Sequence, residues 1–242
     1  MLGHEQKCPS IVLHLCYGAN MCGRISTAGL SADSLKTHFG VDSAFPFTLS
    51  YNIAPTLQIP AIIEQDNIRK LTAFRWGLIP HWVKDINIIT TAFNARAETV
   101  AHKPLFRDAI KSKRCLVLAS GFYEWQKQGG KKQAYYIYRA DKRPLAFAGL
   151  WDLWENNITG DAIESCTIIT TSATQQMTQI HERMPVVLES ESYDTWLDPE
   201  FNDTDVLQDI LIAPKEDVLE MYPVSSYVNN SRNDGEACIE RL

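Results

Sequence analysis

The amino-acid sequence predicts an α+β fold in which a mixed, largely antiparallel and barrel-like β core carries peripheral helices. Two observations support this fold class. The middle of the 242-residue chain is mostly β-rich, and helical and strand patterns interleave without the regular βαβ alternation of a doubly wound sheet. In addition, no stretch approaches the ~18 apolar residues that a bilayer-spanning helix needs, so we expect no membrane partner.

The first half of the chain has local signals for one capped helix and one tight hairpin. Ser31 is a good N-cap and Gly40 a good C-terminal glycine, while Asp66-Asn67 separates two runs rich in β-branched residues. The predicted elements here are a helix over 31–39, a hairpin of strands 58–63 and 68–76, and a short basic helix over 103–113.

The second half begins with a hairpin around Gly129-Gly130 and ends with acidic helices and a last strand. The predicted strands are 115–126, 134–139, 144–153, 166–171 and 218–224. The predicted helices are 174–180, which leads to His181, and the acidic segments 190–197 and 204–212.

The first 20 residues have no clear period, cap or repeat, and they end directly before Met21-Cys22-Gly23-Arg24. We therefore expect residues 1–21 to be a leader or a misassigned start that is removed in the mature form. Residues 22–242 have no linker or low-complexity segment and are predicted to form one domain.

Charge is unevenly distributed along this acidic chain, whose formal net charge is −6. Residues 103–143 hold 11 Lys/Arg and 3 Asp/Glu, whereas residues 144–242 hold 4 and 19. The basic zone is either an anion-binding surface or a solvated face, and composition does not separate these interpretations.

The six cysteines form no CxxC pair and no zinc-ligand spacing with histidine. Neither a disulfide framework nor a metal site is signalled, and no cofactor is expected. The 11–16 apolar run is too short for a secretory signal, which typically needs about 7–15 apolar residues. We therefore expect a reducing, cytoplasmic location.

Four polar clusters lie within otherwise apolar or aromatic sequence, at 21–24, 93–99, 121–125 and 180–185. Each one alone proves little, because a single Cys, His or Glu is usually structural. Together with the runs 51–56, 75–80, 223–225 and 228–230, they occur in an order that resembles the SOS response-associated peptidase (SRAP) family of abasic-site-processing proteins. The resemblance extends from Cys22 nearly to the C-terminus.

The resemblance implies a monomeric SRAP fold that binds single-stranded DNA and joins covalently to an abasic site. In the family, the nucleophile is an N-terminal cysteine exposed by removal of the initiator methionine. Carried over by motif, Cys22 is the nucleophile, and Asn94, Glu124 and His181 are the supporting catalytic residues. The expected location becomes the nucleoid when DNA is damaged.

The chemistry of an N-terminal cysteine is consistent with this role. The α-amine would form an imine with the open-chain aldehyde of an abasic sugar, and the thiolate would then close a thiazolidine. An α-amine titrates at about 7.7–8.0 and a lysine at about 10.4, so the α-amine has the larger neutral fraction near pH 7.

The supporting residues have plausible acid, base and hydrogen-bonding roles. Glu124 would shuttle protons, with its pKa raised by its neighbours Tyr123 and Trp125. Its alternative is a surface glutamate on a strand, since strand alternation places Glu124 on the opposite face from both rings. His181 would assist ring opening, stabilise charge or protonate the imine, or else be structural. Asn94 would orient the amine or sugar, or else form a turn before a short helix.

Several residues of the matching motifs are candidate DNA contacts. The candidates are Arg24, Arg75, Arg96 and Arg183 as phosphate ligands, Trp76 and Trp125 as base-stacking residues, and Pro55 from the 51–56 run. Either tryptophan has a core role as its alternative. Lys111, Lys113 and Arg114 would add a wider positive field, or belong to a solvated face.

An internal cysteine has an amide nitrogen, which forms no imine, so residues 1–21 conflict with this mechanism. Three explanations are open: translation starts at Met21, the leader is cleaved by self-processing, or the chain as written does not crosslink. We favour a start at Met21. Two other functions remain open. One is a cysteine peptidase or amidohydrolase that acts in trans with Cys22, His181 and Glu124. The other is a module that binds single-stranded DNA without chemistry.

Overall fold

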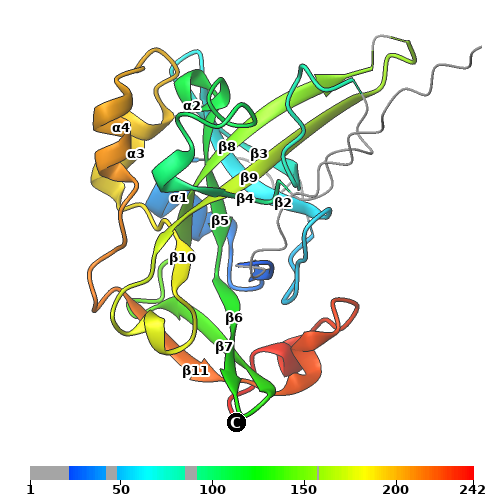
Figure 1. Cartoon of the computed structure of the whole chain (residues 1–242), viewed down its shortest axis with the longest axis vertical. Helices are drawn as coiled ribbons and strands as arrows, with labels where there is room; N and C mark the ends of the chain where they lie inside the picture. Colours follow the sequence, from blue (N-terminus) through cyan, green and yellow to red (C-terminus); the bar gives the residue numbers. More distant parts are fainter. Residues whose placement is uncertain (1–21, 42–47, 85–91, 157) are drawn as a thin grey trace, which may run out of the picture.

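The computed structural model describes residues 22–41, 48–84, 92–156 and 158–242. The predicted leader or misassigned start at 1–21 lies outside the described residues. The described chain forms two β-sheets with short helices around them (Figure 1). No helix in these ranges is long and apolar enough to cross a membrane.

The larger sheet closes on itself and forms a barrel. Its order is β10-β9-β3-β2-β5-β8, and an additional β8–β9 pairing closes the ring, with β4 paired to β9. The β3–β9 and β4–β9 pairs are parallel and the others antiparallel, which confirms the mixed, barrel-like α+β fold. The strands are β2 (Gln58–Gln65), β3 (Ile68–Trp76), β4 (Asn94–Arg96), β5 (Arg114–Ala119), β8 (Leu145–Glu155), β9 (Ala162–Ser172) and β10 (Arg183–Pro185).

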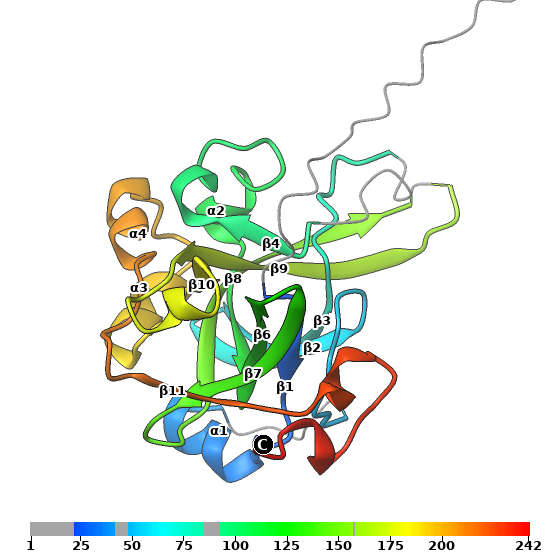
Figure 2. The same cartoon turned by 60° about the horizontal axis from the view of Figure 1, so that its bottom comes forward.

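The smaller sheet is antiparallel and has the order β1-β6-β7-β11. Figure 2 shows it in front of the barrel. Its strands are β1 (Ile25–Ser26), β6 (Gly121–Gln128), β7 (Lys131–Arg139) and β11 (Leu219–Pro223). The predicted strand over 218–224 is therefore confirmed with slightly shorter bounds.

The predictions that depend on local signals are confirmed. Helix α1 (Ala32–Phe39) has Ser31 as its N-cap and left-handed Gly40 at its end. The β2–β3 hairpin turns at Asp66 and Asn67, with φ of 56° and 58°, and the β6–β7 hairpin turns at Gly129-Gly130. Positive φ at both central residues is the geometry of a tight type I′ turn.

Two predicted helices are wrong in length. The basic segment 103–113 is a series of turns that ends in α2 (Ala109–Ser112), and 174–180 holds only the 3₁₀ turn η3 (Met177–Gln179). In the second segment the Thr174 hydroxyl accepts from the Met177 N–H, as an N-cap does, but the turn that follows ends at Gln179. The acidic segments 190–197 and 204–212 are η4 (Ser190–Ser192) with α3 (Tyr193–Leu197), and α4 (Thr204–Ile210).

The predicted strand 115–126 is also corrected, because the chain changes sheet at Ser120. The Ser120 N–H and hydroxyl both donate to the Ser26 carbonyl, at 2.8 and 3.0 Å. These bonds direct the chain away from β5 and toward β1, so that β5 belongs to the barrel and β6 to the smaller sheet.

One hydrophobic cluster joins the two sheets and is here called the central cluster. It contains Cys22, Ile25, Phe122 and Ile137 from the smaller sheet side, together with Phe74, Trp76, Phe147, Cys166 and Ile168 from the barrel. All of these side chains are fully or almost fully buried. The barrel and the smaller sheet are therefore one packed unit.

Candidate active site

The pairing of β1 with β6 places Cys22 beside Glu124. Ile25 and Phe122 are register partners, and the Tyr123 N–H donates to the Arg24 carbonyl at 3.0 Å. As the strands run antiparallel, stepping back two residues from Ile25 to Gly23 corresponds to stepping forward two residues from Phe122 to Glu124, and Cys22 directly precedes Gly23. The Cys22 N–H donates to Glu124 Oε1 at 2.6 Å, and both residues are buried.

Glu124 is a buried carboxyl group with a strongly altered proton affinity. Burial raises its pKa to about 8, while hydrogen bonds from the Cys22 and Trp125 N–H groups act in the opposite direction. The carboxyl is therefore largely protonated at pH 7, and the alternative of a surface glutamate is wrong.

Strand alternation separates Glu124 from its aromatic neighbours, as predicted. Tyr123 and Trp125 pack with Val224 and Val228 in a cluster apart from the central cluster. Glu124 instead meets Cys22, which belongs to the central cluster. Burial on the Cys22 side of β6, rather than contact with the Tyr123 and Trp125 rings, explains the raised pKa.

The Cys22 thiol is fully buried as well. Burial, and then the nearby Glu124, raise the pKa of the thiol well above its ordinary value. The group is a neutral thiol at pH 7 in this environment, so its use as a nucleophile requires a base. The backbone of Cys22 has a φ of 28°, which is an unusual conformation for a residue with a side chain.

Asn94 approaches the same residue from the barrel. Its Nδ2 donates to the Cys22 carbonyl at 3.4 Å. Asn94 opens strand β4, whose parallel pairing with β9 fixes its position, and η2 (Ala97–Thr99) follows the strand. The alternative of a turn-forming asparagine is therefore wrong, although a short helix does follow.

His181 lies between the η3 turn, which ends at Gln179, and β10, which begins at Arg183. Its Nδ1 accepts the Arg183 N–H at 3.1 Å, which assigns the ring proton to Nε2. Burial lowers the pKa of His181, so the ring is neutral at pH 7. The turn is docked on β6, since Gln126 Nε2 donates to the Gln179 carbonyl at 2.7 Å. Within the described residues, no hydrogen bond joins His181 to Cys22 or Glu124.

Three of the four candidate phosphate-binding arginines have internal partners, and two of them, Arg24 and Arg183, have more than one. Arg24 Nη1 donates to Asn52 Oδ1 and to the Val228 carbonyl, each at 2.7 Å. Arg183 forms a two-pronged ion pair with Glu98 and donates to the Thr170 carbonyl at 2.6 Å. These contacts hold both guanidinium groups in fixed positions.

The other DNA candidates differ widely in exposure. Arg96 is exposed at the end of β4, Arg75 is partly buried with Nη1 bonded to the Gly77 carbonyl, and Pro55 is partly exposed in a loop. Trp125 is partly buried and donates from Nε1 to Asn229 Oδ1 at 2.7 Å. Trp76 is fully buried in the central cluster, where no base can stack on it, so its core role holds.

Arg114 is not part of a positive surface. The side chain is buried, and it donates to five backbone carbonyls, those of Ile110, Lys111, Trp196, Asp198 and Phe201. Its role is to hold α3 and the following loop against β5. Lys113 is paired with buried Asp152, and only Lys111 of this group remains an exposed cation.

Asn52 is an organising residue that the sequence analysis did not single out. It is buried, and it bonds Arg24 and three carbonyls of the C-terminal segment. The signal was its place in the 51–56 run, between partly apolar neighbours where a polar side chain needs partners.

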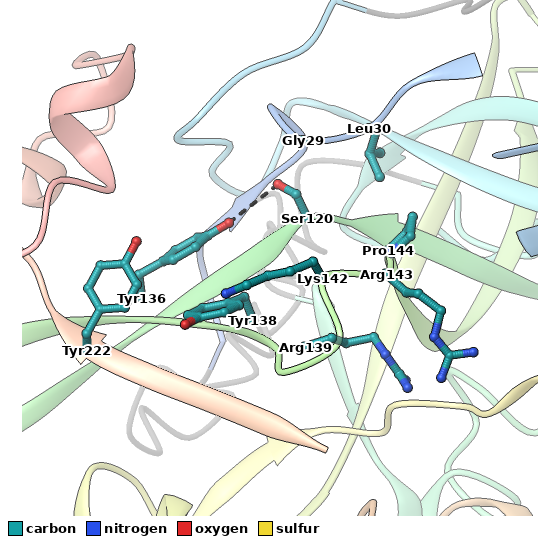
Figure 3. Close-up of a pocket in the computed structure, with 10 residues that line it drawn as sticks. All are labelled: Gly29, Leu30, Ser120, Tyr136, Tyr138, Arg139, Lys142, Arg143, Pro144 and Tyr222. Atoms are coloured by element: carbon teal, nitrogen blue, oxygen red, sulfur yellow. Dashed lines mark hydrogen bonds between the residues drawn. The ribbon is translucent and has the colours of Figure 1, made fainter. Parts of the chain in front are cut away.

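A pocket of about 260 Å³ lies on the face of the smaller sheet opposite Glu124 (Figure 3). Tyr136 lines it and is the register partner of Tyr123, so it shares the face that Glu124 does not. The cations at its rim have partners, since Lys142 Nζ lies 3.7 Å from the Tyr138 ring centre and Arg143 is 2.7 Å from Asp141. The pocket is separate from the Cys22 site.

Comparisons with known proteins place these features in a family context. Residues 21–231 match the model of the family described as SOS response associated peptidase (SRAP). The chain is 41% identical over 224 residues to the Bacillus subtilis abasic site processing protein YoqW, covering 91% of this chain and 99% of that protein. It is 38% identical to the abasic site processing protein HMCES of Xenopus tropicalis, covering 80% of this chain and 66% of that protein.

Solved structures have the same fold. A crystal structure of a Bacteroides thetaiotaomicron protein aligns with a TM-score of 0.82 at 28% identity, over 91% of this chain and all of the other. A Bordetella bronchiseptica protein aligns with a TM-score of 0.74 at 25% identity, over 84% of this chain and all of the other.

Proposed function

The chain belongs to the SOS response associated peptidase family, and from that premise we propose that it processes abasic sites in single-stranded DNA by forming a covalent crosslink through Cys22. The observation that carries this proposal is the 2.6 Å contact between the Cys22 nitrogen and Glu124 Oε1. The relatives named as abasic site processing proteins, among them YoqW, support the lesion as substrate.

The reaction begins once Cys22 is the first residue and its nitrogen is a free amine. The amine attacks the aldehyde carbon of the ring-opened sugar and forms a carbinolamine. Glu124 protonates the departing hydroxyl, and water leaves as the imine forms. The Glu124 pKa of about 8 is close to the 7.7–8.0 of an α-amine, so a proton passes between the two groups at little cost.

The Cys22 thiol completes the adduct. The imine is formed protonated on nitrogen and Glu124 is then a carboxylate, so the thiol proton passes to Glu124, Sγ adds to the iminium carbon, and the nitrogen keeps its proton as the ring amine. The products are a thiazolidine and one water molecule, with no oxidant or reductant consumed. Because burial raises the pKa of this thiol, a base in contact with the residue is required for this step.

Asn94 and His181 assist the reaction of Cys22 and Glu124. The Asn94 amide holds the Cys22 carbonyl and thereby fixes the direction of the chain end. His181, neutral with its proton on Nε2, donates to the sugar oxygen during ring opening. Arg96 and Arg183 bind the flanking phosphates, and the chain acts as a monomer at the nucleoid.

Self-processing is the second part of the proposal. If residues 1–21 are translated, water hydrolyses the peptide bond between residues 21 and 22: residue 21 leaves as a carboxylate, and the Cys22 nitrogen, protonated by Glu124 with which it is in contact, leaves as the amine. The positive φ of Cys22 supports this step, because such backbone conformations cost of order 1–3 kcal/mol and this torsion ceases to exist after cleavage.

The test uses chain that begins at Cys22 and single-stranded DNA with one abasic site. We expect a heat-stable adduct on a denaturing gel, at a mass equal to the sum of protein and DNA minus one water. Cys22→Ala abolishes it, and Cys22→Ser yields an imine that persists only after borohydride reduction. A stable adduct with Cys22→Ala would contradict the proposal, and salt-sensitive binding without any adduct would favour a non-covalent module.

A further inference from the structure

The C-terminal segment folds back onto the beginning of the domain. Residues 226–238 contain the turns η5 (Ser226–Asn229) and η6 (Glu236–Cys238), and Figure 2 shows this segment in red beside β1. Buried Asn52 joins the beginning of the described domain to the C-terminal segment. Its Nδ2 donates to the carbonyls of Val228, Asn230 and Asn233, at 3.3, 3.0 and 2.8 Å.

The other end of the Asn52 amide bonds Arg24. Oδ1 accepts from Arg24 Nη1 at 2.7 Å, and the same Nη1 donates to the Val228 carbonyl at 2.7 Å. The Arg24 guanidinium lies 5.7 Å from the Trp125 ring centre, and Trp125 in turn donates to Asn229. Arg24 is thus held between Asn52, the C-terminal segment and the residue next to Glu124.

This arrangement has a consequence for Cys22 that follows from its position. A first residue has no preceding chain to hold it, and chain ends are mobile unless they are tied down. Gly23, the residue between Cys22 and Arg24, adds backbone freedom. The side-chain anchor nearest in sequence to Cys22 is therefore Arg24, and the orientation of Arg24 is set by Asn52.

We propose that Asn52 is a positioning residue that holds the Cys22 amine against Glu124 through Arg24, an inference that depends on the function proposed above. Only an amide supplies both requirements of this location: an acceptor for the guanidinium, and two N–H donors that are shared among the three carbonyls. A misplacement of about 1 Å at a reacting group can cost about 10²-fold in rate.

The chain offers a matched control in Asp234. Its carboxylate accepts from the Tyr51 N–H at 2.7 Å and from the Ser50 hydroxyl at 3.2 Å, so it attaches the same C-terminal segment to the same loop. No hydrogen bond or ion pair joins Asp234 to Arg24 within the described residues. Asp234→Ala therefore loosens the attachment and leaves the Arg24 contact in place.

The experiment compares Asn52→Ala, Asn52→Asp and Asp234→Ala in chain that begins at Cys22. The measurements are the adduct rate at saturating abasic DNA, the Kd for DNA with a tetrahydrofuran analogue that lacks the aldehyde, and the urea midpoint. We expect Asn52→Ala to lower the saturated rate 10–100-fold with a Kd within threefold of the parent. Asn52→Asp keeps the acceptor for Arg24 and retains more of the rate, and Asp234→Ala stays within threefold.

A second readout does not use DNA. Glycolaldehyde converts an N-terminal cysteine to a thiazolidine, and intact mass gives the rate against pH. We expect Asn52→Ala to move this pH profile toward that of a free cysteinyl peptide, and Asp234→Ala to leave it unchanged. The positioning role is overturned if Asn52→Ala and Asp234→Ala change the adduct rate and the pH profile equally, each in proportion to its loss of stability in urea. The unsubstituted protein tests the proposed function separately. If its pH profile with glycolaldehyde differs from that of a free cysteinyl peptide, but it forms no adduct with abasic DNA, the proposed function is overturned instead.

Discussion

Replacement of Glu124 by glutamine tests the buried, protonated carboxyl directly through protein stability. The side chain is 2% exposed, and its pKa rises from the ordinary 4.5 to about 8. Below pH 4.5 the folded and unfolded chains both carry the proton. Between pH 4.5 and 8 only the unfolded chain releases it, so the free energy of unfolding falls as the pH rises through this window.

The expected size follows from the two pKa values. Each tenfold difference in proton affinity is worth about 1.4 kcal/mol, so ionisation in the folded state costs about 5 kcal/mol in total. Over pH 5 to 8 the parent loses about 4 kcal/mol that Glu124→Gln does not lose. The variant should therefore become more stable relative to the parent as the pH rises, while its adduct rate falls about 10²–10⁴-fold.

Urea unfolding followed by tryptophan fluorescence at pH 5, 6.5 and 8 measures this difference. In these unfolding experiments both proteins carry Cys22→Ala so that the chain remains uncut, whereas the adduct rate is measured with Cys22 present. Glu98→Gln is the control, because its ion pair with Arg183 lowers the pKa of Glu98 and confines that titration to below pH 4.5. A Glu124→Gln difference that stays constant across pH would refute the argument that Glu124 is held protonated.

Three further predictions concern packing and the site. Gly121→Ala places a Cβ 2.3 Å from the Tyr136 ring and should lower the free energy of unfolding by about 2–3 kcal/mol in urea titrations. Arg114→Met keeps side-chain bulk but leaves five carbonyls without their donor. We expect the free energy of unfolding to fall by about 3 kcal/mol or more and proteolysis after α3 to become rapid. An unchanged digestion pattern would contradict the role of Arg114 in holding α3 against β5. His181→Ala should lower the adduct rate about 10–100-fold at pH 7 with an unchanged urea midpoint, as measured in single-turnover gels.

Local signals made much of the fold predictable. Ser31 with Gly40 and the Asp66-Asn67 pair act through bonds and torsions within a few residues, and each prediction from them is confirmed. Ser120 acts through a carbonyl 94 residues away in sequence, so no local pattern marks the change of sheet there. Strands β1, β4 and β10 have two or three residues each, too few to display a period.

The site was predictable to a different extent. The motif match predicted that Cys22, Asn94 and Glu124 belong to one site, and in the structure Cys22 forms hydrogen bonds with both Glu124 and Asn94. The sequence did not predict which of the candidate DNA-binding side chains are buried. Trp76 and Arg114 have the residue types of DNA contacts, yet partners distant in sequence enclose both. Asn52 escaped notice for the same reason, as its four partners come from residues 24 and 228–233.

The central cluster has a consequence for how the molecule would meet its lesion. Glu124 lies in the smaller sheet and Cys22 just before its strand β1, whereas Asn94 and Arg183 lie in the larger sheet, and shared apolar packing prevents the two sheets from moving apart. Alignment of the reacting groups is thus completed during synthesis and folding, long before any damaged strand arrives. If the proposed function holds, small losses of this packing should slow crosslinking well before they unfold the chain.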